Sequence, residues 1–501
     1  MKKVLLIGLY DSKLLGIRYL SSSLLVAGHH TDIAFLKTFN SHNTKEPTEV
    51  EYELLYSLIE RLAPDVIGIS VMCSFYLDIV RKITIDIKSR FKVPMLWGGA
   101  VVTLFPEKSL EYADIVFRGE GEDAVCELVN ALDKGESYAS IENIGYKDGD
   151  NAIVNPIRML RQDLDALPFP DLGDGNKFYI NNDTLNEFDP ELRGYSYELT
   201  GSRGCPNQCS YCSTANIRRL HSGLGKFIRF RSPENVIEEI KQAAKAMPNL
   251  NLLRFWDEIF PWDEEWVKEF AELYKKEVNR PFEVWGHPRF TYSKNMELLV
   301  DAGLSKIVIG VQSGSPDVRK NIYKRNETQE HILECARILS DAKVPVVIYD
   351  FILDHPFETS KDLEETLQLC RSLKKPFTLQ LHGLSFLPGT DIEDIAIEKG
   401  VKTREEIERE QSRSLSEQYR AMVWWRIGKG LTGDSEKIFW HSLIFISQFK
   451  HGERIIKRAL KNEKLKKNPA PLLRIQRFYS LLFTYRMGFR KLMFMLGLKK
   501  R

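Results

Sequence analysis

The stretch Gly204-Cys205-Pro206-Asn207-Gln208-Cys209-Ser210-Tyr211-Cys212 places three of the seven cysteines of this chain within eight residues. The spacing C-x₃-C-x₂-C allows three thiolates on one loop to hold three irons of a cubane cluster and to leave the fourth iron open. A structural zinc site would have four protein ligands, and no second Cys or His pair lies nearby. We therefore interpret Cys205, Cys209 and Cys212 as ligands of a [4Fe–4S] cluster, with structural zinc as the alternative.

A strand-like segment, Tyr197–Thr200, ends just before this loop and is the first of six such segments, which alternate with amphipathic helical stretches. This alternation predicts an α/β partial (β/α)6 barrel of the TIM type over residues 196–395, with its chemistry at the carboxyl ends of the strands. The further strands are expected at Leu252–Trp256, Phe282–Gly286, Lys306–Val311, Val346–Ile352 and Thr378–His382.

Residues 1–135 show the same alternation, which predicts a doubly wound, Rossmann-like parallel sheet. Ligands of such sheets bind at the carboxyl ends of the strands, where glycine allows the backbone to approach a ligand closely. The strands are expected at Val4–Gly8, Thr31–Leu36, Val66–Val71, Pro94–Trp97 and Ile115–Arg118, and the ligand loops at Leu9–Gly16, Met72–Phe75, Gly98–Thr103 and Gly119–Gly121.

Residues 136–195 lose this alternation and contain several prolines, which is typical of a linker. Residues 396–501 have a helical composition. From Lys450 to Arg501 there are 16 Lys and Arg residues and two Glu residues, which gives this segment a charge of +14. Because the whole chain has a net charge of +2, residues 1–449 have a net charge of −12. Leu472–Arg501 holds eight of these cations, no acid, and apolar residues at helical spacing. The pattern predicts a basic amphipathic helix suited to an anionic membrane, or alternatively a helix packed on the barrel.

The length of 501 residues and 43% hydrophobic content suit two or three domains. The sequence has no uninterrupted apolar stretch of about 18 residues and no signal-peptide pattern, so we expect a cytoplasmic protein, with peripheral contact at the inner face of the membrane as an option for the tail. We expect no nucleic-acid partner. The four remaining cysteines are scattered, and buried free thiols explain three of them better than disulfides.

The cysteine loop, with Tyr211 before its last cysteine, resembles the signature of the radical S-adenosylmethionine (SAM) superfamily. The resemblance implies that the open iron chelates the amino and carboxylate groups of SAM. Reductive cleavage of SAM then gives methionine and a 5′-deoxyadenosyl radical. An external electron donor such as flavodoxin or ferredoxin is implied as well.

Three later segments resemble other parts of the superfamily pattern. Gly310–Ser315 resembles the segment that contacts SAM after the fourth strand, which implies contacts from Gln312, Ser313 and Gly314 in addition to Tyr211. Asp350–Thr359 resembles the fifth-strand segment and implies His355 as a cofactor contact, although Asp354 and Phe357 stand where glycine is usual.

Phe255–Phe260 resembles the end of the second barrel strand, where an acidic pair often faces the cavity. Asp257 and Glu258 are therefore the catalytic candidates. The alternative is that these carboxylates cap the next helix or are solvated.

Together with the barrel, the first sheet resembles the cobalamin-binding domain of cobalamin-dependent radical SAM enzymes. The matching pieces are Leu15–Leu20 with Ala27–His29, Asp65–Ser70, Trp97–Val102 and Arg118–Glu122. The resemblance implies that glycine loops at the strand ends support the corrin ring. The implied cobalamin contacts are Tyr10, Gly16, Ser70, Cys73, Ser74, Gly98, Gly99, Ala100, Val102, Gly119, Glu120 and Gly121.

One departure concerns the cobalt ligand. Cobalamin domains similar to methionine synthase carry Asp-x-His-x-x-Gly, whose His binds cobalt, whereas this chain has Asp11-Ser12-Lys13-Leu14-Leu15-Gly16. Lysine is protonated at neutral pH unless it is strongly buried. Lys13 is therefore not expected to bind cobalt.

The predicted function is that of a cobalamin-dependent radical SAM enzyme, most consistent with methyl transfer to an unactivated carbon of a small or lipid-like substrate. In the mechanism that the resemblance implies, one SAM methylates cobalamin and another supplies the radical. The rivals are a cobalamin-dependent radical cyclase or rearrangement enzyme, a non-catalytic protein that keeps the fold, and a corrinoid carrier with a structural barrel.

Overall fold

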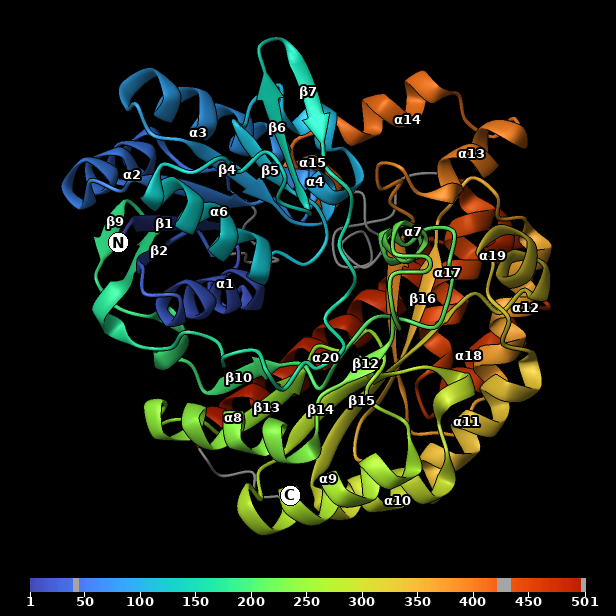
Figure 1. Ribbon diagram of the computed structural model, residues 1–501. Coiled ribbons are helices and arrows are strands. Elements are labelled where there is room, and N and C mark those ends of the chain that lie inside the picture. The colour runs from blue at the N-terminus through green and yellow to red at the C-terminus, as the bar shows by residue number, and fades with distance from the viewer. Residues whose placement is uncertain (39–44, 421–433, 497–501) are drawn as a thin grey trace.

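The computed structural model describes residues 1–38, 45–420 and 434–496 (Figure 1). A sheet with its helices, coloured blue to teal, forms one side of the molecule, and a second sheet with its helices curves around the other side. This arrangement confirms the predicted α/β class with a helical C-terminal region. The parts of that region at 421–433 and 497–501 lie outside the described residues.

The first sheet has the strand order β7-β6-β5-β4-β3-β1-β2-β8-β9. Its central strands are parallel, whereas β6, β7 and β9 are antiparallel to their neighbours. The order reverses between β1 and β3, and ligands of doubly wound sheets bind at such a reversal. The strands are β1 (Lys3–Leu9), β2 (His30–Leu36), β3 (Val66–Ser70), β4 (Met95–Gly98), β5 (Ile115–Phe117), β6 (Ile144–Asp148), β7 (Asn151–Val154), β8 (Lys177–Asn181) and β9 (Thr184–Asn186).

Helices cover both faces of this sheet, as the near-continuous apolar strands require. Successive residues of β1 point to opposite faces: Val4 and Leu6 pack in the core under α1 and α6, and Leu5 and Ile7 in the core under α2 and α3. The helices are α1 (Leu15–Val26), α2 (Glu49–Leu62), α3 (Leu77–Arg90), α4 (Ala100–Leu104), α5 (Pro106–Ser109) and α6 (Glu122–Lys134).

The segment 136–195, expected as a linker, also extends both edges of the sheet. It supplies β6 and β7 at one edge and β8 and β9 at the other. The β8–β9 turn consists of Asn182 and Asp183, which have positive φ angles of 53° and 57°. Residues of this kind at the two central positions of a hairpin turn are a short-range hairpin signal. The strands are too short to show a clear hydrophobic period.

The second sheet is entirely parallel and has the order β10-β13-β14-β15-β16-β17, as expected for a partial barrel. Two further short strands, β11 and β12, pair with each other antiparallel in a separate two-stranded sheet. The strands are β10 (Ser196–Leu199), β11 (Ser202–Arg203), β12 (Arg229–Phe230), β13 (Leu252–Phe255), β14 (Phe282–Gly286), β15 (Leu304–Gln312), β16 (Val347–Leu353) and β17 (Thr378–Gly383).

Helices cover the outer face of this barrel, and their apolar side chains form the largest core of the protein with those of the strands. The barrel helices are α7 (Ser213–Leu220), α8 (Pro233–Ala246), α9 (Glu264–Glu277), α10 (Ser293–Ala302), α11 (Gln329–Asp341) and α12 (Ser360–Ser372). The later helices are α13 (Asp391–Glu398), α14 (Arg404–Gln411), α15 (Leu415–Arg420), α17 (Ser435–Ser447), α18 (Gly452–Ala459), α19 (Glu463–Lys467) and α20 (Ala470–Met495). Short helical turns lie at η1 (Ser74–Tyr76), η2 (Asp174–Asn176), η3 (Pro190–Arg193), η4 (Pro288–Phe290) and η5 (Val318–Ile322).

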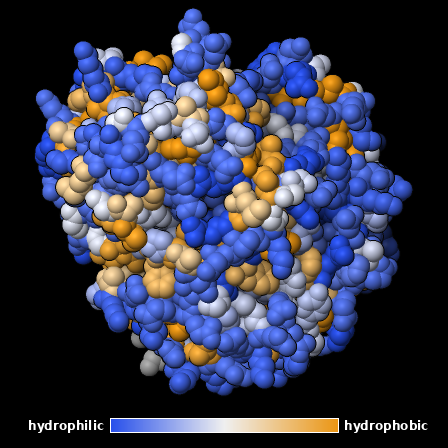
Figure 2. Space-filling model, viewed as in Figure 1, coloured by the Kyte–Doolittle hydropathy of each residue, from blue (hydrophilic) through white to orange (hydrophobic). Residues whose placement is uncertain are grey.

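The surface in the view of Figure 2 is largely hydrophilic, with hydrophobic side chains in separate patches. None of the helices in the described part of the chain has both the length and the apolar character needed to cross a membrane.

Candidate active site between the two sheets

The cysteine loop connects β11 to α7 and is held from both sides. Ser210 donates from its backbone N–H to the carbonyl of Tyr323, at 3.1 Å, and from its hydroxyl to that of Ile322, at 2.6 Å. Gly204 has φ +96°, and a Cβ there would lie 2.2 Å from the carbonyl oxygen of Phe227. Only glycine therefore fits directly before Cys205.

The three thiols of this loop are free; Cys209 is buried, whereas Cys205 and Cys212 are half-buried. Burial raises the pKa of the Cys205 thiol to about 12, so that its thiolate needs a compensating cation. Among the described residues, no group of three or more His, Cys, Asp or Glu side chains is arranged to hold a single metal ion. A cubane cluster does not need such a group, because each thiolate binds a different iron.

A buried cation, Arg325, lies beside the cysteine loop and was not found from the sequence. Its Nη1 donates to the hydroxyl of Tyr211 at 3.0 Å and to Sγ of Cys209 at 3.8 Å. Its Nη2 donates to the carbonyl of Gly310 at 2.7 Å. Glu327 accepts a hydrogen bond from Nε of Arg325 and lies 3.5 Å from Nε2 of His287. Arg325 thus joins the cysteine loop to the end of β15.

The expected SAM contacts after β15 differ in their surroundings. Gln312, with φ +68°, lies near Gly310 and Arg325. Ser313 accepts at its hydroxyl from the backbone of Ser315, at 3.1 Å. A Cβ at Gly314 would stand 2.2 Å from Cα of Thr366, so this glycine permits close packing against α12.

His355 belongs to the loop after β16 and is fully buried. Its Nε2 lies 3.6 Å from Oε1 of Glu358. The other carboxylate oxygen of Glu358, Oε2, lies 3.6 Å from Nε2 of His441 in α17. Neither ring nitrogen of His355 has a hydrogen-bond partner. The structure therefore places this predicted cofactor contact in a buried cluster with the C-terminal region.

The two acidic residues after β13, Asp257 and Glu258, have different surroundings. Asp257 is buried and accepts hydrogen bonds from the backbone N–H of Gly201, at 3.2 Å, and the hydroxyl of Ser202. Burial raises the pKa of Asp257 to about 7. Glu258 lines a cavity, and burial raises the pKa of its carboxyl as well. Asp257 thus fixes the segment that leads into the cysteine loop, whereas Glu258 faces the cavity.

This shared cavity, of about 440 Å³, lies between the two sheets. Strands β1 and β3 contribute Leu6 and Gly68, so the cavity reaches the point where the strand order reverses. The barrel side contributes Thr200, just after β10, Trp256 and Glu258, just after β13, and Ser202 from β11. The expected cobalamin contacts that line it are Gly16, Ser70, Gly98, Gly99, Ala100, Gly119, Glu120 and Gly121.

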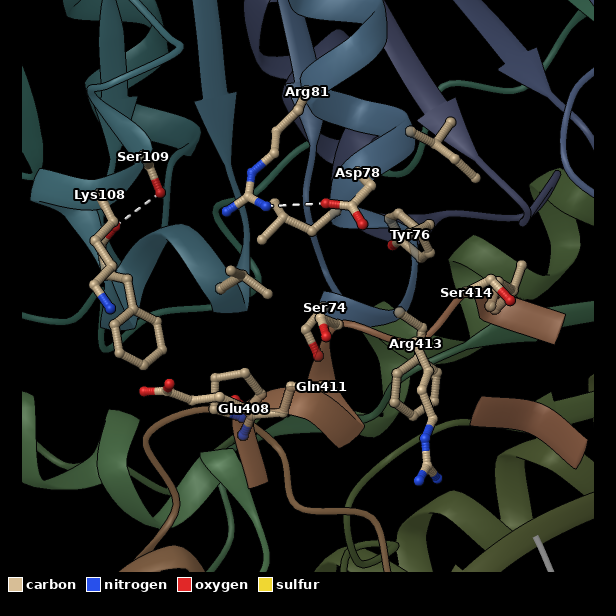
Figure 3. Close-up of a pocket in the computed structure, with 18 of the residues that line it drawn as sticks. Ser74, Tyr76, Asp78, Arg81, Lys108, Ser109, Glu408, Gln411, Arg413 and Ser414 are labelled. Carbon is tan, nitrogen blue, oxygen red and sulfur yellow. Dashed lines mark hydrogen bonds and ion pairs between the residues drawn. The ribbon is translucent and has the colours of Figure 1, made fainter. Parts of the chain in front are cut away.

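The other expected cobalamin contacts do not line the shared cavity. Tyr10 donates to the carbonyl of Lys45 at 3.2 Å, Cys73 caps the start of η1 by accepting from the backbone N–H of Phe75, and Val102 is fully buried. Ser74 lines a second cavity, of about 700 Å³, between η1 and α14 (Figure 3). No residue of the barrel strands lines this second cavity, so it lies apart from the cysteine loop.

Ion pairs join the domains at the rim of the shared cavity. Arg203 pairs with Glu122 at 2.6 Å, and Arg229 with Glu120 at 2.7 Å. Glu120, expected as a cofactor contact, is therefore also an anchor for the barrel. These partners lie 81 or more residues apart along the chain, and no local sequence signal pairs them.

Lys13, at the position of the cobalt-binding His in other cobalamin domains, is directed to the barrel. Its Nζ lies 3.2 Å from Glu191 and 3.4 Å from Glu198. Lys13 does not line the shared cavity.

His221, which follows α7, was not found from the sequence. Its Nδ1 lies 2.8 Å from the carbonyl of Ile217, which can only accept, so Nδ1 carries the proton. In the neutral ring Nε2 is then the acceptor. This atom is buried and has no hydrogen-bond partner, and His221 lines the shared cavity. A Cβ on Gly119 would stand 2.9 Å from this atom. An unpartnered buried acceptor indicates a ligand that supplies an N–H or O–H group.

Comparisons with known proteins agree with this geometry. Residues 199–370 match the family model of the radical SAM superfamily, and residues 3–129 match that of the B12 binding domain. The chain therefore joins the two domains that together define cobalamin-dependent radical SAM enzymes. Its cofactors are a [4Fe–4S] cluster, SAM and cobalamin.

Two curated relatives have different activities in their names. An uncharacterized methyltransferase of Pyrococcus horikoshii is 26% identical over 356 residues, covering 70% of this chain and 73% of the relative. An anaerobic magnesium-protoporphyrin IX monomethyl ester cyclase of Cereibacter sphaeroides is 26% identical over 382 residues, covering 70% of this chain and 55% of the relative.

Two solved structures share the fold. The cobalamin-dependent SAM radical enzyme OxsB, with aqua-cobalamin and SAM bound, aligns with a TM-score of 0.67 at 15% identity, covering 100% of this chain and 81% of the other. The radical SAM methyltransferase TsrM from Kitasatospora setae, with tryptophan and a SAM analog bound, gives 0.62 at 16% identity, covering 79% and 76%.

The residues of this chain fit the three cofactors. Glycines without side chains line the shared cavity at the strand ends, and the free acceptor of His221 suits the carboxamides of a corrinoid. The loop Cys205–Cys212 supplies three thiols, as a cluster with one open iron requires. The buried cation Arg325 lies beside this loop.

Proposed function

We propose that this protein transfers a methyl group to an unactivated carbon of a small or lipid-like substrate. The observation that carries the proposal is the shared cavity, because it brings the glycine loops of the B12 binding domain to the same space as the strand ends of the radical SAM domain. When bound there, the cluster and SAM supply a radical and cobalamin supplies a methyl group.

The side chains of this chain have separable tasks in this proposal. Cys205, Cys209 and Cys212 hold the cluster, while Arg325 fixes Tyr211 beside it. Glu258, whose carboxyl pKa is raised by burial, is positioned to exchange a proton with the substrate. An external electron donor such as flavodoxin or ferredoxin supplies electrons.

Trp256 is the candidate substrate contact. Its ring is half exposed, lines the shared cavity and stacks on Trp285 with the ring centroids 4.2 Å apart. An aromatic surface of this kind binds apolar parts of a substrate and excludes water from them. This contact supports a substrate with an apolar part.

The two fates of SAM test the proposal without knowledge of the substrate. The reconstituted protein would be incubated anaerobically with a low-potential reductant, SAM carrying a deuterated methyl group, and a cell extract as the source of substrate. Methyl transfer predicts both S-adenosylhomocysteine and 5′-deoxyadenosine, with the label in a new product. Formation of 5′-deoxyadenosine without S-adenosylhomocysteine or labelled product would contradict it.

A radical cyclase is the second candidate, because the named cyclase matches as large a share of this chain as the named methyltransferase does. A cyclase would form 5′-deoxyadenosine alone and leave the methyl label in methionine.

A further inference from the structure

The last helix, α20, is docked on the protein through one of its faces. Gln476 is fully buried and accepts at Oε1 from the hydroxyl of Ser442 in α17, at 2.9 Å. Tyr479 stacks on Phe449 with the ring centroids 4.1 Å apart. Arg490 donates to the carbonyl of Ser305 at 3.2 Å. The orientation of α20 is therefore set by contacts spread along its length.

The opposite face of α20 carries a stripe of large apolar side chains that nothing in the described structure covers. Each is between 48% and 79% exposed, and they make up eight of the seventeen large apolar side chains found exposed in the described part of the chain. With about 100° between successive residues of a helix, they fall within an arc of about 140°. The apolar stripe consists of Phe478, Leu481, Leu482, Tyr485, Phe489, Leu492, Met495 and Leu496.

The exposed apolar residues elsewhere do not form such a stripe. They are distributed over several elements, for example Val26 in α1, Val50 in α2 and Ile85 in α3. Single exposed apolar side chains are normal, whereas a continuous row on one helix indicates a binding surface.

Charge identifies the partner of the apolar stripe. Arg474 and Arg477 are exposed on α20. The sequence contains no Asp or Glu after Glu463, whereas Leu472–Arg501 contains eight Lys and Arg residues. A second copy of the chain would bring two segments of the same strong positive charge together, which is unfavourable. A surface that is both apolar and anionic satisfies the apolar stripe and the cations at once.

We propose that α20 binds the surface of an anionic phospholipid membrane, with the apolar stripe inserted among the acyl chains and the cations among the headgroup phosphates. Because the opposite face of the helix is packed on α17, the helix lies in the plane of the membrane rather than across it. Long basic side chains at its edge can reach the phosphates while their stems stay in the apolar layer. The proposal does not depend on the reaction that the barrel catalyses.

Vesicle sedimentation of the full-length reconstituted protein tests this proposal. Vesicles of phosphatidylcholine alone would be compared with vesicles that also contain about 30% phosphatidylglycerol. We expect at least tenfold tighter binding to the anionic vesicles, and most of this difference should disappear at about 0.5 M salt because the charges are then screened. Equal binding to both vesicles, or none to either, would overturn the proposal.

A matched pair of variants tests the apolar stripe itself. The variant Leu481→Ser, Tyr485→Ser, Phe489→Ser should bind anionic vesicles at least tenfold more weakly. The control Val26→Ser, Val50→Ser, Ile85→Ser should bind as the wild type does. Circular dichroism and iron content establish that both variants are folded. Wild-type binding by the first variant would contradict the proposal, as would light scattering that shows a wild-type dimer dissociated by these substitutions.

Discussion

The guanidinium of Arg325 lies 3.8 Å from Sγ of Cys209, so that a buried positive charge adjoins a ligand of the proposed cluster. A cation at this distance stabilises the more negative, reduced state of a cluster. It also forms the link from the cysteine loop to the end of β15. The charge of Arg325 is therefore expected to influence how readily the cluster accepts an electron.

The variant Arg325→Gln tests this electrostatic effect. We expect the midpoint potential of the cluster to fall by tens of millivolts, because removing a neighbouring cation disfavours the reduced state. Redox titration followed by electron paramagnetic resonance measures the change. Arg325→Lys keeps the charge and should restore most of the potential, and identical potentials for Gln and wild type would refute the role of the charge.

His221 is expected to contribute to cobalamin binding from the radical SAM domain. The variant His221→Phe removes the free acceptor at Nε2, and about a tenfold loss of hydroxocobalamin affinity is expected for one lost hydrogen bond of about 1.4 kcal/mol. Equilibrium dialysis measures this affinity. His221→Gln retains an acceptor and should lose less. Unchanged affinity in the Phe variant would show that Nε2 does not contact the corrinoid.

Gly99 is expected to tolerate no side chain. Its φ is +117°, and a Cβ would stand 2.7 Å from the carbonyl oxygen of Val71. The variant Gly99→Ala should therefore lower the free energy of unfolding by roughly 1–3 kcal/mol and weaken retention of cobalamin. Urea denaturation and corrinoid content measure the two effects. Gly175→Ala is the control, because no atom lies within 4 Å of its added Cβ.

Asp257 should make the stability of the cofactor-free protein depend on pH. Its folded pKa of about 7 exceeds that of an ordinary Asp, so the folded state holds the proton more tightly, and stability falls as pH rises from about 4 to about 7. The effect is on the order of 4 kcal/mol. Asp257→Asn should flatten this dependence in urea denaturation series, whereas Asp148→Asn, at the exposed end of β6, should not. A wild-type slope in the Asp257 variant would exclude this residue as the source.

The strands of both sheets and the cysteine loop could largely be predicted from the sequence. Short apolar runs that alternate with amphipathic helical stretches predicted every strand from β1 to β5 and the six strands of the barrel. These runs are visible because parallel strands that are buried on both faces are continuously apolar. The cysteine spacing of Cys205–Cys212 and the glycines at Gly98 and Gly119 were equally visible, since they belong to short continuous segments.

The contacts between the domains could not be predicted in the same way. Arg325 lies more than 100 residues from Cys209 in sequence, and His221 reaches Gly119 only after the two domains have packed together. Strands β8 and β9 were missed because they are short, and their pairing depends on the free edge of β2. Such features arise from tertiary packing rather than from a local pattern.

The central claim is that one chain holds both a [4Fe–4S] cluster and cobalamin, and anaerobic reconstitution tests it most directly. The protein would be reconstituted with iron, sulfide and hydroxocobalamin and separated by gel filtration. An absorption spectrum and analysis of iron and corrinoid per chain would follow. We predict one [4Fe–4S] cluster and one cobalamin per chain in the wild type. Cys209→Ala should lose the cluster but keep the corrinoid, and Cys126→Ala should keep both. A wild-type chain that retains iron but no corrinoid, or a Cys209 variant that retains the full cluster, would contradict the account.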